Sequence, residues 1–232
     1  MNASSRSTTA RLVVSLALAL GLPCLVLGDT YKTEALKEAA PRSVSKEIGK
    51  ILQEKGTRVL DSKGKPFVDV WLRKDVDPGG DRSELGIEFG KMPEGTVLGV
   101  VKYHVKGYDF RDNKIPEGVY TIRYGVQPAD GDHLGVSETR DFVLLSPIKE
   151  DKKPDALGYD DLVKLSAKST RSKHPPILYV MKTTGGEAKE LPRLVEDADR
   201  EYWTFDCAIP NKKADAKPVR LGIVIVGHSE DI

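Results

Sequence analysis

The sequence predicts a mainly β fold: an antiparallel β-sandwich, Ig-like or jelly-roll-like, with an N-terminal helical arm and one helical insertion. From residue 57 onward, short stretches alternate apolar and polar side chains, as half-buried strands do. Pro- and Gly-containing turns separate these stretches. Helical spacing is confined to the first part of the mature chain and to residues near 155–169. Strands that follow strands in this way favour a sandwich.

The N-terminus has the three-part layout of a secretory signal peptide. Residues 1–11 contain Arg6 and Arg11 and no acid, and residues 12–22 are almost entirely apolar. The segment then ends in Gly28, a small residue that suits a cleavage site. We therefore expect a signal peptide over 1–28, a helical arm over 29–56 and a β-sandwich domain over 57–232. The mature protein is expected to be exported, to the periplasm or the extracellular space.

Two alternatives to cleavage are less favoured by the residues. An uncleaved anchor needs roughly 20 apolar residues, and the run that begins at Leu12 is shorter and contains Pro23. Lipidation at Cys24 normally requires a small residue before the cysteine, whereas Pro23 stands there. No other apolar run has the length of a bilayer span, so we expect no membrane partner after cleavage.

Charge and cysteine content narrow the class of protein. Residues 1–28 hold two of the 36 Lys and Arg and none of the 35 Asp and Glu, so the mature net charge is −1. A nearly neutral chain gives no reason to expect nucleic acid as a partner. Cys207 is the one cysteine left after cleavage, so no internal disulfide is expected. Its alternation with Trp203, Phe205 and Ile209 predicts an inert core thiol.

The helical arm is expected to contain two helices. The first covers residues 30–40 and stops at Pro41. The second is capped by Ser43 or Ser45 and ends at Gly56. We interpret the arm as a lid that packs on the sheet, with a partner-binding helix as the alternative.

The remaining elements follow from the change to a period of two. In the strand over 119–126, Tyr120 and Tyr124 are expected in the core and Arg123 on a solvated face. A charged linker over 150–155 precedes the helical insertion. Strands are expected over residues 58–60, 67–73, 85–89, 97–106, 119–126, 140–146, 177–182, 201–209 and 219–226.

A resemblance is carried by residues 113–124. There Pro116, Gly118 and Tyr120 form a Pro-x-Gly-x-Tyr entry to a strand. This segment resembles the strand entry of uncharacterised exported bacterial β-sandwich proteins, and the pattern also occurs in transthyretin-like and carbohydrate-binding sandwiches. The resemblance covers about a tenth of the chain. It implies the fold and export, and it carries no catalytic residue.

The first candidate site is a glycan-binding edge made by Tyr108, Phe110, Asp112 and Asn113. Aromatic rings stack on sugars, and neighbouring acid and amide groups form hydrogen bonds with hydroxyl groups. The alternative is that Tyr108 and Phe110 alternate into the core as a continued strand.

The second candidate site is a metal loop. Asp130 and Asp132 offer oxygen ligands for calcium, and His133 offers nitrogen for another divalent metal. The loop lacks the further ligands of a calcium-binding motif, so an ordinary turn is the alternative. His104 lies between Lys102 and Lys106 and is expected to be solvated rather than to bind metal.

No motif predicts catalysis. The sequence contains no Gly-x-Ser-x-Gly elbow and no complete phosphate-binding loop. We therefore expect an exported non-catalytic binding or structural module whose partner is an envelope protein or a glycan, with no cofactor. The alternatives are a secreted hydrolase with a carboxylate site assembled by the fold, and a protein that binds calcium or another divalent metal.

The signal peptide leads to a direct prediction. When the chain is expressed in an exporting host, the mature protein should begin at Asp29, because Val26 and Gly28 suit the two positions that face the peptidase. N-terminal sequencing or intact mass measures this. Retention of residues 1–28 on the secreted product would contradict it.

Overall fold

The computed structural model describes residues 30–130, 137–170, 174–184 and 190–227. Strands predominate, and the two α-helices are short. In chain order the elements are β1 (Lys32–Leu36), α1 (Lys46–Ile51), β2 (Gly56–Leu60), β3 (Pro66–Leu72), β4 (Val97–Tyr103), β5 (Gly107–Tyr108), β6 (Lys114–Ile115), β7 (Gly118–Val126), β8 (Asp141–Pro147), α2 (Tyr159–Ser166), the 3₁₀ helix η1 (Ala167–Ser169), β9 (Ile177–Met181), β10 (Arg193–Asp197), β11 (Tyr202–Ile209) and β12 (Val219–Val226).

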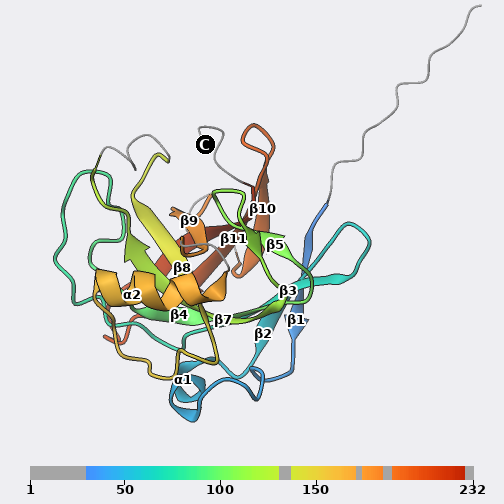
Figure 1. Ribbon diagram of the computed structural model, residues 1–232, viewed down its shortest axis with the longest axis horizontal. Coiled ribbons are helices and arrows are strands. Elements are labelled where there is room, and N and C mark those ends of the chain that lie inside the picture. The colour runs from blue at the N-terminus through green and yellow to red at the C-terminus, as the bar shows by residue number, and fades with distance from the viewer. Residues whose placement is uncertain (1–29, 131–136, 171–173, 185–189, 228–232) are drawn as a thin grey trace, which may run out of the picture.

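Ten strands form one sheet in the order β1-β2-β3-β4-β7-β8-β9-β12-β11-β10, while β5 and β6 form a separate hairpin (Figure 1). Each neighbouring pair is antiparallel, which confirms the mainly antiparallel β prediction. The sheet curls until β1 approaches β10. The ring of Tyr31, just before β1, lies 5.4 Å from the ring of Trp203 in β11. The expected pair of separate sheets is instead one nearly closed sheet, because β9 pairs with both β8 and β12.

The inner face of this sheet holds the main hydrophobic core. Tyr120, Ile122 and Tyr124 of β7 lie inside it, as their alternation predicts. Cys207 is also buried there, as predicted, and burial raises the pKa of its thiol to about 12. Side chains from strands far apart in sequence therefore pack into one core.

Two predicted strands differ from the structure. Strand β4 ends at Tyr103 rather than at residue 106, and Val105 is 49% exposed. Residues 85–89 form turns rather than a strand. The buried carboxylate of Asp141 accepts hydrogen bonds from the backbone N–H groups of Glu88 and Phe89, at 2.7 and 3.1 Å. These donors are therefore unavailable to a neighbouring strand.

The N-terminal arm is only partly helical. The expected helix over 30–40 is wrong, because this segment forms β1 and pairs with β2 from Lys32↔Leu60 to Leu36↔Gly56. An available sheet edge outweighs the weak local helix preference. The second helix is confirmed as α1, where the Ser45 side chain accepts a hydrogen bond from Ile48 N at 3.2 Å. It buries Ile48 against Trp71 in a second small core.

The helical insertion is confirmed as α2 followed by η1. Helix α2 lies across the outer face of β8 and β7 and buries Leu162 (Figure 1). The hydroxyl groups of Ser166 and Ser169 both donate to the Leu145 carbonyl at 2.7 Å. These two bonds satisfy buried polar groups and hold the helix against β8.

The outer face of β7 is buried, which corrects the expectation that Arg123 is solvated. Arg123 is 1% exposed and contacts the segment over 150–155 that is expected as a charged linker. Its guanidinium donates to both carboxylate oxygens of Asp151, at 2.6 and 2.8 Å, and to the Asp155 carbonyl at 2.8 Å. Asp151 also accepts from the Thr121 hydroxyl. Burial is tolerated because the charges are paired and hydrogen-bonded.

Breaking this buried ion pair should destabilise the protein strongly. Arg123→Met or Asp151→Asn is expected to lower the free energy of unfolding by about 3–5 kcal/mol, since each leaves one buried charge uncompensated. The matched control is Lys168→Met, which removes an exposed ion pair with Glu150 and should cost less than about 1 kcal/mol. Urea unfolding of the mature protein measures both. Equal costs for the buried and exposed changes would contradict the prediction.

Removal of the hydroxyl group should change the stability of the protein differently at two buried tyrosines. Tyr124 donates to Asp141 at 2.6 Å, whereas the buried Tyr103 hydroxyl has no hydrogen-bond partner among the described residues. Burial raises the pKa of both groups, so both stay protonated at neutral pH. We expect Tyr124→Phe to cost about 1–3 kcal/mol and Tyr103→Phe to be neutral or stabilising. Thermal melts of the two variants provide the comparison.

Candidate functional site

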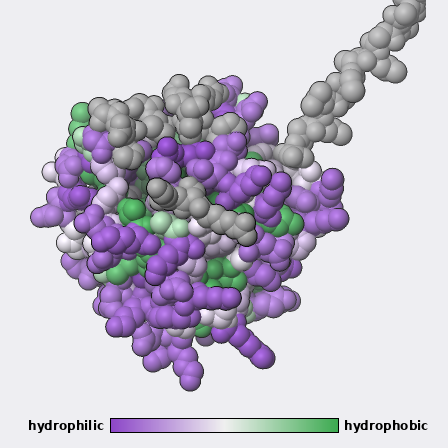
Figure 2. Space-filling view, in the orientation of Figure 1, coloured by the Kyte–Doolittle hydropathy of each residue, from purple (hydrophilic) through white to green (hydrophobic). Residues whose placement is uncertain are grey.

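A pocket of about 170 Å³ lies between α2, the neighbouring ends of β7 and β8, and the start of β9. On the face that carries α2 the molecular surface is mostly hydrophilic, with separate apolar patches (Figure 2). Within the pocket the proportions reverse, since most lining residues are apolar. A concave apolar site with few polar groups is the usual form of a small-molecule site.

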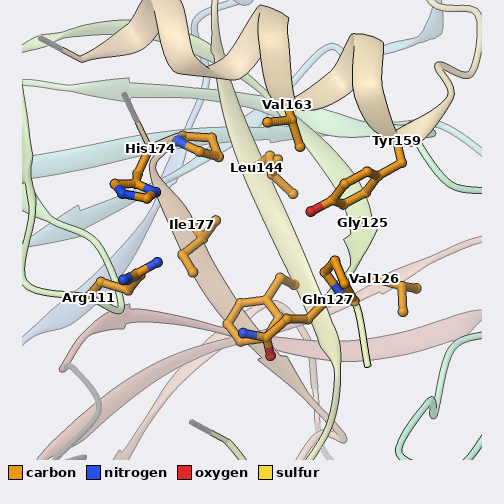
Figure 3. A pocket seen from close by; sticks show the side chains of 12 residues that line it. Arg111, Gly125, Val126, Gln127, Leu144, Tyr159, Val163, His174 and Ile177 are labelled. Carbon is orange, nitrogen blue, oxygen red and sulfur yellow. The ribbon is translucent and has the colours of Figure 1, made fainter. Parts of the chain in front are cut away.

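The apolar part of the pocket is built from the sheet and the helix. Phe142 and Leu144 belong to β8, and both line the pocket. Ile177 begins β9, and Val163 faces the sheet from α2 (Figure 3). Gly125 of β7 has no side chain, and a Cβ placed there would meet Leu144 Cδ1 at 2.6 Å. A side chain at position 125 would displace the end of the Leu144 side chain, which forms part of the pocket lining.

Four polar side chains border the pocket: Arg111, Gln127, Tyr159 and His174. Arg111 and His174 lie on one side, and the Tyr159 hydroxyl points in from the other (Figure 3). Burial, followed by the charges of nearby acids, raises the pKa of Tyr159, so this hydroxyl remains a neutral hydrogen-bond donor. The arrangement offers a cation and hydrogen-bonding groups around an apolar floor.

Asp109 positions Arg111 beside β9. Its buried carboxylate accepts hydrogen bonds from the backbone N–H groups of Arg111 at 2.9 Å, Asn113 at 2.8 Å and Ile177 at 3.3 Å. Burial raises the pKa of Asp109, while these donors act in the opposite direction. A further backbone bond joins Phe110 N to the Ile177 carbonyl at 2.8 Å. The β5–β6 hairpin is thereby tied to the pocket wall.

The structure separates the residues of the predicted glycan-binding edge. Phe110 is 1% exposed and packs among Phe142, Tyr179 and Tyr202, so its ring belongs to an aromatic core. Asn113 is half-buried and its side-chain amide contacts Asp109. Tyr108 and Asp112 are exposed, and the Lys106 ammonium lies 5.6 Å from the centre of the Tyr108 ring.

The predicted metal loop falls mostly outside the described residues. Asp132 and His133 are not described, and Asp130 is exposed at the end of a described segment. Among the residues that the structure describes, no group of three or more His, Cys, Asp or Glu side chains has the arrangement of a metal site. The metal assignment therefore stays a prediction.

His104 has a structural partner rather than the solvated position expected from sequence. Its Nε2 lies 2.8 Å from Asp69 Oδ2, and Asp69 also accepts two hydrogen bonds from Arg58, at 2.7 and 2.9 Å. Burial alone would raise the pKa of Asp69, but the bonds from Arg58 and His104 outweigh it and lower the pKa. This cluster ties β2, β3 and the end of β4 together on the outer face.

Sequence reasoning missed the pocket because its polar residues occupy four separate segments. Arg111, Gln127, Tyr159 and His174 belong to no shared motif, and each taken alone is an ordinary loop or helix-end residue. The one local signal was the predicted glycan-binding edge, which marked the loop over 108–113 but named neighbours of Arg111 rather than Arg111 itself.

Comparison of the chain with protein-family models, with curated proteins and with solved structures found no match. In the part of the chain that the structure describes, no helix combines the length and apolar character needed to cross a membrane.

Proposed function

We propose that this chain is an exported, non-catalytic binding module and that its ligand enters the pocket between α2 and the β7–β8 pair. Export rests on the signal-peptide pattern of residues 1–28. The ligand site rests on a single observation: Arg111, Tyr159 and His174 converge from separate segments on one apolar pocket.

The lining favours binding over hydrolysis. Of the described residues that line the pocket, none is Asp, Glu, Ser or Cys. A glycosidase needs two carboxylates across its substrate, and acyl transfer needs an activated nucleophile. The lining holds one imidazole, that of His174, and among its described residues no serine or cysteine stands beside this group to be activated by it. The envelope-protein and glycan partners expected from sequence remain predictions beside this pocket-centred proposal.

The pocket volume limits what enters it. A cavity of about 150 Å³ accommodates benzene in a well-studied engineered protein. The 170 Å³ pocket therefore suits one six-membered ring with a small substituent. A larger ligand is expected to insert a single ring and leave the remainder outside.

A neutral one-ring probe tests this proposal. Benzyl alcohol should bind the mature protein, and Val163→Trp should weaken binding at least about 10-fold by filling the pocket from α2. Lys164→Trp introduces the same ring at the adjacent exposed position and should bind like the parent. Saturation-transfer NMR titration provides the affinities, with circular dichroism as the folding check. Parent-like binding by a folded Val163→Trp protein would place the ligand elsewhere.

A further inference from the structure

The described lining of the pocket carries positive charge and no negative charge. Of the described lining residues, Arg111 carries the one permanent charge, and no lining carboxylate balances it. None of the ion pairs in the described ranges includes Arg111, whereas Arg58, Arg123 and Arg200 each contact a carboxylate at 2.9 Å or less. A half-buried guanidinium beside an apolar cavity therefore has unused capacity to bind an anion.

The carboxylate closest in sequence is already used. Asp109 accepts backbone bonds from Arg111, Asn113 and Ile177, and it also contacts the Asn113 side-chain amide. This carboxylate holds the backbone of Arg111 in place and leaves the guanidinium to the pocket. Asp109 thus fixes the backbone of Arg111 and forms no ion pair with the Arg111 guanidinium.

The remaining lining defines the body of the ligand. Phe142, Leu144 and Ile177 supply an apolar floor, and the volume of about 170 Å³ admits one ring. Guanidinium groups bind carboxylates through two parallel hydrogen bonds, which makes arginine selective for planar anions. His174 lies on the same side of the pocket as Arg111 (Figure 3).

We propose that Arg111 binds the carboxylate of a small one-ring acid whose ring lies on the Phe142–Leu144–Ile177 floor. This inference rests on the proposed function, because it assigns a ligand class to the same pocket. It goes further by predicting charge selectivity, which a merely apolar pocket does not have.

The test compares benzoate with benzyl alcohol, two one-ring probes that differ in charge. Arg111→Gln should weaken benzoate binding about 10- to 100-fold, the loss expected for a charge-assisted hydrogen-bonded pair, and leave benzyl alcohol within about 3-fold of the parent. Arg111→Lys should retain part of the benzoate affinity, because the charge remains but the two-bond geometry is lost. Lys114→Gln removes an exposed charge from the same hairpin and should change neither affinity.

Each outcome decides between the two proposals. If Arg111→Gln leaves benzoate binding unchanged, or weakens both probes equally, the carboxylate assignment is overturned, while loss of both probes in Val163→Trp still supports the pocket. If the folded parent binds neither probe at millimolar concentration, both proposals fail. Selective loss of benzoate in Arg111→Gln, with both probes lost in Val163→Trp, supports both.

Discussion

The buried pair of Arg123 and Asp151 holds together the parts of the molecule on which the pocket depends. Arg123 extends from β7, whereas Asp151 lies in the segment that leads from β8 to α2. The guanidinium also donates to backbone carbonyls on that segment. The course of the segment, and hence the place where α2 begins, is therefore set by one charged side chain. Glycine at position 95, with φ of 74°, lets the preceding turn approach Leu157 of the same segment.

The nearly closed sheet imposes a second constraint: its outer face needs cover of its own. The inner face is filled by one core, and separate groups bury the outer face at different places. Residues around α1 cover Trp71, while the β5–β6 hairpin supplies Phe110 to an aromatic cluster over Phe142 and Tyr179. These covering elements come from distant parts of the chain and leave part of the outer face uncovered. The pocket is this uncovered part, where α2 and the hairpin approach each other over β8 and β9.

This origin explains the chemistry of the pocket. Its floor is apolar because it is the uncovered part of a sheet face otherwise buried, and its rim is polar because loop and helix-end residues surround it. Asp109 is the link between the two, since its carboxylate joins the hairpin to the first residue of β9. The same hydrogen bonds that complete the fold thus place Arg111 at the pocket.

Local patterns in the sequence determined the antiparallel β character, the inward set of β7, the buried Cys207 and the capped helix at Ser45, because each depends on alternation or on residues within one turn. Tertiary structure decided the rest. Residues 30–40 became β1 because the edge of β2 was available, and Arg123 became buried because Asp151 lies 28 positions away yet beside it in space. The pocket joins residues 111, 127, 159 and 174, which no local spacing relates. Ion pairs and strand pairs between distant residues depend on the whole fold, so they cannot be predicted from one stretch of sequence.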